Sequence, residues 1–359
     1  MPDRRPILAS ERTRFDVLTA TDLRFPGGNS ASTAEEIRIQ GRMGLSSGLI
    51  HLPSKVFSRP RPMNAALADR LRTGEAEIIV SGRRTSRAGL LLFRHPKIFT
   101  AAALPRVEAE RVVLAINHPP ISAFGPEPEY DLLAIASRLE RTYGMPPALA
   151  PIGPAIRDRL LQRWGDAIRL TPEDWVNVFD LDRFDVHRDP PRGGVLRIGR
   201  HSRPGREKWP DSREAILASY PDRADTPVNV LGGIDPILPI LEGLPRHWTV
   251  HPFGAMDPAD FLRGIDVFVY QHHPGWTEAF GRVVIEAMAS GLPVVVPPYM
   301  RALVGDAGIC AEPEEVGARL ETLREPETWR LWSGRARRFA RDGFGDDVHR
   351  RRLARLGIG

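Results

Sequence analysis

Residues 266–296 read DVFVYQHHPGWTEAFGRVVIEAMASGLPVVV. An apolar run at 266–270 leads into a polar loop, a helical pattern begins near Phe280, and Gly291 precedes a second apolar run at 293–296. Apolar residues spaced i, i+3, i+4 and i+7 give the helix a face that can pack on a sheet. Two buried parallel strands joined by a helix predict an α/β fold with a parallel sheet.

The alternation of apolar runs and helical patterns extends over the whole chain, which predicts two doubly wound, Rossmann-like parallel-sheet domains. In such sheets ligands bind beyond the carboxyl ends of the strands. Ser32 or Thr33 is expected to cap the first helix, and further helices are expected at 131–143, 157–163 and 327–355. The expected strands are 15–21, 48–52, 77–80, 89–93, 111–116, 195–198, 228–231, 249–252, 266–270, 293–296 and 308–311.

The polar, turn-forming stretch 185–194 reads DVHRDPPRGG and predicts the linker between the two domains. We therefore expect a first Rossmann-like domain over 1–188 and a second one over 189–330. The arginine-rich segment 331–359 is expected to be helical and to pack back toward the first domain.

The composition is that of an ordinary soluble protein, with 42% hydrophobic and 26% charged residues in 359. The single cysteine, Cys310, excludes an intramolecular disulfide, argues against a cysteine-ligated metal and suits a reducing cytoplasm. The first residues carry no apolar core long enough for a signal peptide, and the longest apolar stretch, 292–300, is too short to span a membrane. These features predict a cytoplasmic protein.

Positive charge is concentrated in the first part of the chain, because residues 1–110 hold 18 Lys and Arg against 11 Asp and Glu, a net of +7. This excess can face anionic lipid or a phosphorylated acceptor, although a solvated surface explains it equally well. The clusters Arg59-Pro-Arg61 and Arg83-Arg84-Thr-Ser-Arg87 are candidates for that contact. Because 50 basic residues face 45 acidic ones overall, we expect no nucleic-acid partner.

The loop and helix of the opening stretch combine an anion site with two carboxylates. Free N–H groups of the first helical turn, from about Phe280 to Val283, and the helix dipole suit a diphosphate. Glu278 lies before the helix and Glu286 further along it, so they can accept hydroxyl hydrogen bonds on both sides of the phosphates. Alternatively, Glu278, Arg282 and Glu286, spaced i, i+4, i+8, form a surface ion-pair ladder.

Residues 278–295 resemble the donor-site signature of retaining GT-B glycosyltransferases of bacteria, in particular glycosyltransferase family 4. The resemblance implies the GT-B fold, in which two Rossmann-like domains face a cleft. It also implies that Glu278 contacts the donor sugar hydroxyls and Glu286 the nucleotide ribose. The backbone at three further residues would approach the sugar and phosphate: Ala279, Phe280 and Gly281.

Two cations follow the first strand of the second domain. In the family, an arginine matching Arg200 and a lysine matching Lys208 clamp the diphosphate, where fixed cations neutralise the leaving group. This sequence departs from the pattern, because Trp-Pro follows Lys208 and the loop is longer. Arg203 or Arg206 can therefore replace the lysine.

The first domain supplies further candidates at the ends of its strands. Gly27 and Gly28 resemble the family's glycine loop, which lets backbone approach the donor phosphates or the acceptor. A tight turn is the alternative reading. His118 follows the strand at 111–116 and matches a histidine that lines the sugar pocket in similar enzymes, although a histidine before Pro-Pro can also be structural.

The resemblance thus implies a transferase with Glu278, Arg200, Lys208 and His118 as catalytic residues. It implies a UDP- or GDP-sugar donor, a sugar or lipid-linked acceptor, and no metal or other cofactor. The departing phosphate would act as the base, since no dedicated base is evident. We expect a role in polysaccharide or glycoconjugate biosynthesis, and a cytoplasmic location with possible peripheral contact at the inner face of an anionic membrane.

Several alternatives stay open. A sugar-nucleotide epimerase has the same architecture, a phosphorylase of similar fold would need a lysine-bound pyridoxal phosphate, and the high pI suggests a non-catalytic polyanion-binding protein. Asp180-Leu-Asp182 resembles a manganese motif but has no partner ligands nearby in the sequence. His272-His273 can suggest a metal, yet adjacent side chains rarely converge on one ion, so a loop contact near the donor site is favoured.

Overall fold

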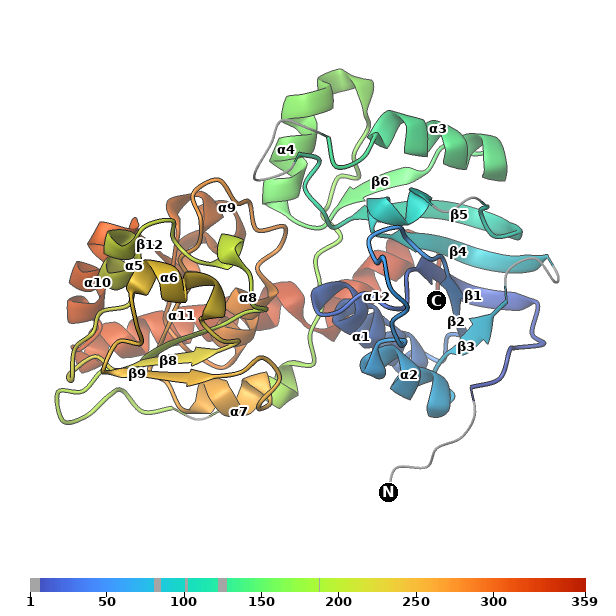
Figure 1. Ribbon diagram of the computed structural model, residues 1–359. Coiled ribbons are helices and arrows are strands. Elements are labelled where there is room, and N and C mark those ends of the chain that lie inside the picture. Colours follow the sequence, from blue (N-terminus) through green and yellow to red (C-terminus); the bar gives the residue numbers. More distant parts are fainter. Residues whose placement is uncertain (1–6, 81–84, 101–102, 122–127, 187) are drawn as a thin grey trace. The chain divides into compact units, whose positions relative to one another are not determined.

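The computed structural model describes residues 7–80, 85–100, 103–121, 128–186 and 188–359. The chain forms two compact units, Met1–Phe179 together with Asp346–Gly359 (unit 1) and Asp180–Gly345 (unit 2). Each unit contains a six-stranded sheet with helices packed around it (Figure 1). The predicted α/β fold with two parallel sheets is confirmed.

The sheet of unit 1 has the strand order β3-β2-β1-β4-β5-β6, with parallel pairing throughout. Its central strands are buried apolar runs because helices cover both faces. The bounds in unit 1 are β1 Arg14–Thr21, β2 Ser47–His51, β3 Glu77–Ile79, β4 Ser86–Arg94, β5 Val107–Ile116, β6 Ala148–Pro151, α1 Gly28–Arg42, α2 Ala65–Arg72, α3 Leu132–Tyr143, α4 Pro154–Trp164 and α12 Asp346–Arg355.

The sheet of unit 2 has the order β12-β11-β10-β7-β8-β9 and is also parallel. The bounds in unit 2 are β7 Ile198–His201, β8 Val228–Leu231, β9 Trp248–His251, β10 Val267–Val269, β11 Val294–Val296, β12 Ile309–Cys310, α5 Arg213–Ser219, α6 Leu238–Leu241, α7 Pro258–Arg263, α8 Arg282–Ala289, α9 Arg301–Val304, α10 Val316–Thr322 and α11 Pro326–Phe344.

Two local predictions need correction. The strand expected at 195–198 shares only Ile198 with β7, which continues to His201. The first helix is not capped by Ser32 or Thr33, because α1 already begins at Gly28, so both residues lie inside it. There Thr33 Oγ1 donates to the Asn29 carbonyl at 2.9 Å.

The observed boundary between the units differs from the predicted one after residue 188. Residues 180–188 belong to unit 2, where the Arg188 guanidinium donates to backbone carbonyls, at 2.6 Å to Ser290 and 2.8 Å to Ile265. These bonds attach the segment to the end of α8 and to the start of β10, so it cannot serve as a free linker.

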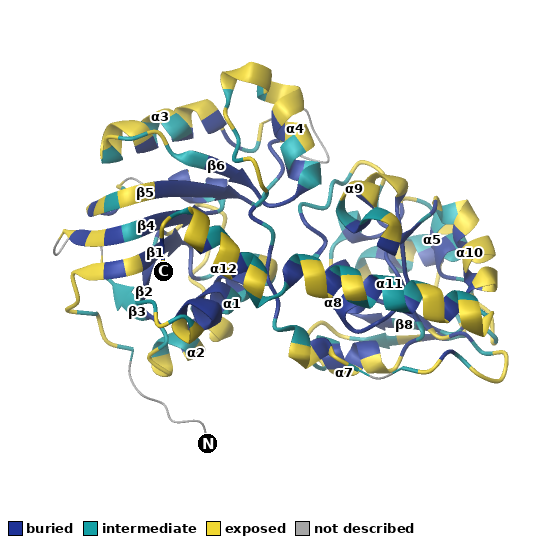
Figure 2. Cartoon of the chain, turned by 180° about the vertical axis from the view of Figure 1, so that it is seen from behind, coloured by how far each residue is buried: buried dark blue, intermediate teal, exposed yellow. Residues whose placement is uncertain are grey.

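The C-terminal helices are divided between the units. Helix α11 lies beside α8 in unit 2 with an exposed outer face (Figure 2), and Trp329 Nε1 donates to the Asp266 carbonyl at 2.9 Å. Helix α12 belongs to unit 1, where Asp346 Oδ1 accepts from Arg38 at 2.5 Å. Residues 331–359 were predicted to pack back toward the first domain, but residues 331–345 of this segment belong to unit 2. No described helix is long and apolar enough to cross a membrane.

A cluster of buried charges attaches α12 to the core of unit 1. Glu36 Oε1 accepts from Arg94 Nη1 at 2.5 Å and from Trp175 Nε1 at 2.9 Å, and it lies 3.6 Å from Arg352 Nη1. The side chains of Glu36 and Arg94 are 1% and 0% exposed. His349, also on α12, lies 3.1 Å from the Gln40 side chain. We call Glu36, Arg94 and Arg352 the buried ionic cluster.

Candidate active site

The candidate site of unit 2 lies where two central strands end. β7 and β10 pair directly, and the strand order reverses between them, so their carboxyl ends form the switch point at which ligands bind in doubly wound sheets. The 3₁₀ turn Arg206–Lys208 follows β7. The loop 270–281 follows β10 and carries Glu278.

Glu278 is the centre of this site. Its Oε2 accepts from Lys208 Nζ at 2.6 Å and from Tyr270 Oη at 2.7 Å. The side chains of Lys208 and Glu278 are only 8% and 16% exposed, so the ion pair is largely shielded from water. The structure therefore brings two sequence-predicted residues together and adds Tyr270, which the sequence analysis missed.

The charge of Glu278 is fixed by these neighbours. Burial alone would raise its pKa, but the positive charge of Lys208 and the hydrogen bonds from Lys208 and Tyr270 outweigh burial and lower the pKa to about 2. Glu278 is thus a carboxylate at neutral pH and can only accept hydrogen bonds.

Three aromatic side chains complete the surroundings. Trp276 covers the ammonium group of Lys208, with the ring centroid 4.8 Å from Nζ. The backbone N–H of Glu278 donates to Tyr299 Oη at 3.0 Å, and Tyr299 also contacts His272 Nε2 at 2.8 Å. Trp276 and Tyr299 were not predicted as site residues, although Trp276 stands two positions before Glu278 in the sequence.

Glu286 is buried on α8 beside two basic residues. Its Oε1 accepts from Arg282 Nε at 2.8 Å, and its Oε2 lies 3.5 Å from His201 Nε2. Burial raises the pKa of Glu286, and Arg282 offsets part of that rise. The alternative interpretation was a surface ion-pair ladder of Glu278, Arg282 and Glu286. Its pair Arg282–Glu286 is present, whereas Glu278 pairs with Lys208. The contact of Glu286 with a ribose stays a prediction.

Arg200 lies on strand β7. Its side chain is 0% exposed, its guanidinium carbon lies 3.8 Å from the ring centroid of Trp209, and Nη1 donates to the Gln271 carbonyl at 3.0 Å. Nη2 donates to the Lys208 carbonyl. The guanidinium of Arg200 is thus enclosed by protein groups, and its predicted contact with the diphosphate stays a prediction. Arg200 holds the backbone of Lys208.

The start of α8 depends on a glycine. Gly281 is the N-cap with φ of 75°, and a Cβ there would lie 2.7 Å from Met300 Cε. The helix begins at Arg282, two residues later than predicted, and the Phe280 side chain is buried against Phe344 with ring centroids 5.7 Å apart. Only the backbone of Ala279, Phe280 and Gly281 is therefore suited to the predicted ligand contact.

The candidates Gly27, Gly28 and His118 lie in unit 1. Gly27, with φ of 74°, is the N-cap of α1, and Gly28 is its first residue. His118 follows β5, its carbonyl accepts from Tyr130 Oη at 2.7 Å, and its Nε2 lies 3.7 Å from Glu129 Oε2. These residues lie after the carboxyl ends of β1 and β5, as expected.

The described residues contain no group of three His, Cys, Asp or Glu side chains that could hold a metal ion. His272 and His273 do not converge, since His272 Nδ1 lies 3.0 Å from the carbonyl of His273. Asp180 and Asp182 flank the start of a 3₁₀ turn, Leu181–Phe184.

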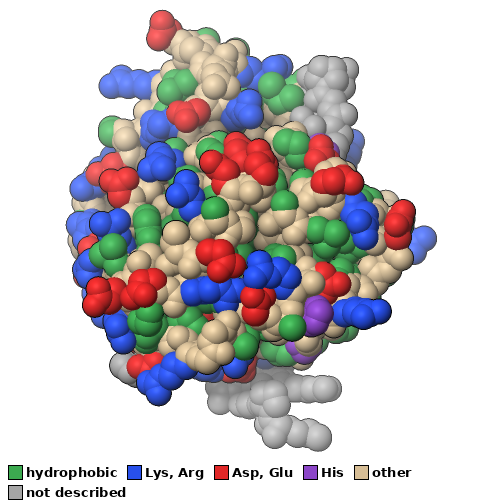
Figure 3. All heavy atoms as spheres, turned by 90° about the vertical axis from the view of Figure 1, so that its left-hand side faces the viewer, with side chains coloured by type: hydrophobic (Ala, Val, Ile, Leu, Met, Phe, Trp, Pro, Cys, Tyr) green, Lys and Arg blue, Asp and Glu red, His purple; other side chains and the backbone are tan. Residues whose placement is uncertain are grey.

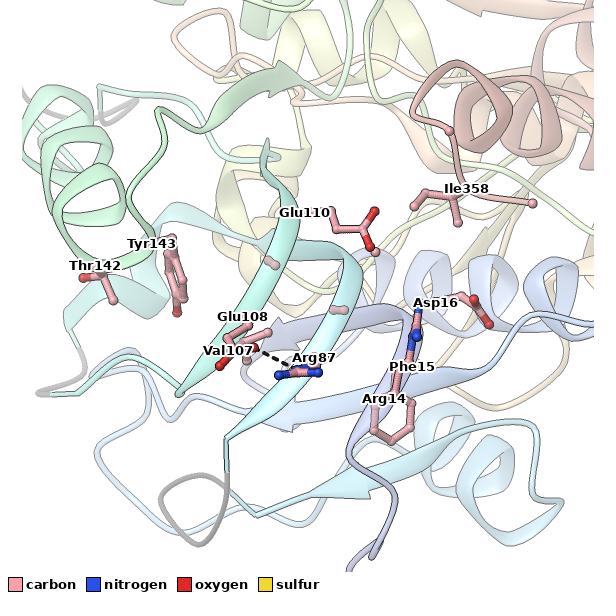
Figure 4. A pocket seen from close by; sticks show the side chains of 15 residues that line it. Arg14, Phe15, Asp16, Arg87, Val107, Glu108, Glu110, Thr142, Tyr143 and Ile358 are labelled. Carbon is pink, nitrogen blue, oxygen red and sulfur yellow. Dashed lines mark hydrogen bonds and ion pairs between the residues drawn. The ribbon is translucent and has the colours of Figure 1, made fainter.

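A cavity of about 780 Å³ lies elsewhere in unit 1, at the amino ends of β1, β4 and β5 (Figure 4). Its lining includes Arg14, Tyr143 and Ile358. Arg87 and Glu108 also line it, and Arg87 Nε donates to Glu108 Oε2 at 2.8 Å. Ligands of doubly wound sheets bind at the opposite edge, so we do not assign the site there.

Four neutral histidines predict acid sensitivity. Burial lowers the pKa of His201 and His349 to about 3 and that of His118 and His272 to about 4. Below pH 6.5 the unfolded chain binds these protons and the folded chain does not, so stability is lost as the pH falls. Each histidine should remove about 1.4 kcal/mol of unfolding free energy per pH unit between pH 6.5 and 4. Denaturant unfolding across this range measures the slope, and His349→Gln should make it shallower. An unchanged slope in that variant would contradict the assignment.

Residues 198–325 match the family model described as Glycosyl transferases group 1. No curated protein sequence matches the chain. Among solved structures, HepE of Anabaena in complex with UDP and glucose is similar with a TM-score of 0.65 and 15% identity, over 95% of this chain and 98% of that one.

Two further solved structures are similar over nearly the whole chain. A glycosyltransferase from Rickettsia africae has a TM-score of 0.65 and 12% identity, over 97% of this chain and 98% of its own. WaaG, a glycosyltransferase involved in lipopolysaccharide biosynthesis, has a TM-score of 0.59 and 15% identity, over 96% and 100%. These likenesses confirm the predicted GT-B fold. Together with the match in unit 2, the comparisons support a glycosyltransferase.

Proposed function

We propose that the chain transfers a sugar from a nucleoside-diphosphate sugar, a UDP or GDP sugar, to a hydroxyl of a sugar or lipid-linked acceptor, with retention as in glycosyltransferase family 4. The observation that carries this proposal is the cluster of Lys208, Glu278 and Tyr270 at the switch point of unit 2. It lies within the stretch that matches the group 1 glycosyltransferase model.

Lys208 and Glu278, which pair with each other, exchange partners when a donor binds. Lys208 is the one lysine of the cluster, and an ammonium group neutralises a leaving diphosphate. When Lys208 turns to the phosphates, Glu278 is freed to accept two hydroxyls of the donor sugar, and Tyr270 still donates to it. The related fold of HepE holds UDP and glucose, which is a ligand pair of this kind.

The other candidates act around this centre. Glu286 accepts the ribose hydroxyls, and the backbone of Ala279–Gly281 approaches the sugar and phosphate. Gly27, Gly28 and His118 of unit 1 contribute to donor or acceptor binding. We propose that the enzyme needs no metal, because Lys208 supplies the charge and the departing phosphate acts as base. Its setting would be polysaccharide or glycoconjugate biosynthesis in the cytoplasm.

Nucleotide binding tests the proposal. UDP or GDP at about 100 times its dissociation constant should stabilise unit 2 by about 2.7 kcal/mol, and ADP should not. Glu286→Ala should lose this stabilisation, whereas Glu314→Ala, at an exposed glutamate of the same unit, should keep it. Thermal unfolding with and without EDTA measures both effects. If no nucleotide stabilises the wild-type chain, the proposed donor site is wrong.

A further inference from the structure

The loop 52–62 between β2 and α2 of unit 1 gathers exposed cations. It reads LPSKVFSRPRP, and Lys55, Arg59 and Arg61 are all exposed. The sequence contains no Asp or Glu from residue 52 to residue 68. We call 52–62 the basic loop.

The cations of the basic loop differ from several neighbouring arginines of unit 1. Within the described ranges, none of its three cations forms an ion pair with a carboxylate, whereas other arginines nearby do. The paired arginines are Arg12 with Glu77, Arg38 with Glu35 and Asp346, Arg42 with Asp346, Arg70 with Glu75, and Arg72 with Asp69. The positive charge of the basic loop is thus available to an external anion.

Apolar side chains accompany these charges. Val56 is 48% exposed, which is high for a valine. Phe57 is half-buried, and the guanidinium groups of Arg61 and Arg24 lie 4.8 and 5.2 Å from its ring centroid. Arginines over an aromatic ring beside an exposed valine form a surface that is both cationic and apolar.

The basic loop is attached to the sheet at its first residues. The N–H of Leu52 donates to the Thr21 carbonyl at 2.9 Å, and Ser54 Oγ donates to Asp22 Oδ2 at 2.8 Å. Prolines at 53, 60 and 62 restrict its backbone further. A loop held in this way presents its side chains with little loss of conformational entropy on binding.

We propose that the basic loop docks the chain on an anionic phospholipid bilayer. Headgroup phosphates match the unpaired cations, and the interfacial region accepts an apolar side chain such as Val56. A soluble anion fits less well, because the cations are spread over an exposed loop. On the face drawn in Figure 3, by contrast, acidic side chains lie among basic ones. The docking does not depend on the proposed sugar transfer.

Vesicle binding by the full chain tests the inference. The chain should sediment with phosphatidylcholine vesicles that contain phosphatidylglycerol, and high salt should release it. Replacing Lys55, Arg59 and Arg61 together by Gln should weaken partition about 100-fold, since each basic residue contributes about fivefold. Val56→Ser should weaken it severalfold, and Val80→Ser, at a valine of similar exposure (45%), should not.

A control variant with the same change in net charge shows whether the position of the cations in the basic loop matters for vesicle binding. Replacing Arg106, Arg246 and Arg319 by Gln removes the same charge from exposed arginines that lack a carboxylate partner in the described part of the chain. This control should leave partition unchanged. The inference fails if both triple variants lose binding equally, if pure phosphatidylcholine vesicles bind equally well, or if the basic loop binds an oligonucleotide but no vesicle. Nucleotide stabilisation of unit 2 should persist in every variant.

Discussion

Exchanging Glu278 for glutamine should lower kcat/KM for sugar transfer by about 10²–10³, the cost of losing one preorganised contact to the reacting group. Glutamine keeps the size of the side chain but removes the negative charge that Lys208 and Tyr270 now face. It also accepts hydroxyl hydrogen bonds less strongly than a carboxylate. The rate of sugar transfer is measured as the release of UDP or GDP from the corresponding nucleotide sugar, chosen by which nucleotide stabilises the chain.

A second variant shows whether the loss of activity in Glu278→Gln arises from the reaction or from a change in structure. Lys208→Met should reduce turnover by a similar factor, and the double variant should lose less than the product of the two single losses, because the residues act as a pair. Glu312→Gln, at an exposed glutamate of unit 2, is the matched control and should stay active. Full turnover in Glu278→Gln would show that the pair is only structural.

Replacing Glu36 by alanine should cost unit 1 about 3–5 kcal/mol of unfolding free energy, because Arg94 and Arg352 would remain buried without their carboxylate. For a unit of this size the loss corresponds to a fall in Tm of about 6–20 °C. Calorimetry of the full chain measures it as a shift of the unit 1 transition.

The control for this prediction is an exposed ion pair between strands β4 and β5 of unit 1. The side chains of Arg87 and Glu108 are 71% and 62% exposed, so Glu108→Ala should cost at most about 1 kcal/mol. Equal losses for Glu36→Ala and Glu108→Ala would contradict the special role of the buried ionic cluster.

The sequence pattern was sufficient to predict most strands of the two sheets, because short, mostly apolar segments of strand length alternate with helical patterns. Only the short strand β6, which contains a proline, was missed entirely. The caps were harder to predict, since Ser32 and Thr33 have the residue types of an N-cap but lie inside α1. What decides their place is the turn at Gly27, which starts the helix earlier.

The site was predictable as a set of positions but not as a set of contacts. Lys208 and Glu278 both follow central strands, yet they are 70 residues apart, and nothing local indicates that they pair. The enclosure of the Arg200 guanidinium by Trp209 and Tyr220 could not be predicted either, because it depends on tertiary packing. Glu36 likewise resembles a surface residue until Arg94, 58 residues away, is placed beside it.

The chain passes between the units twice, after Phe179 and again after Gly345. A single proteolytic cut after Phe179 would therefore not release unit 1 as a free fragment. The second fragment would still contain α12, which is bound to unit 1 through Arg38–Asp346 and the buried ionic cluster. Nicked protein should thus elute as one species from a native column and separate only in denaturant. Residues 180–345, by contrast, form one contiguous stretch of the chain.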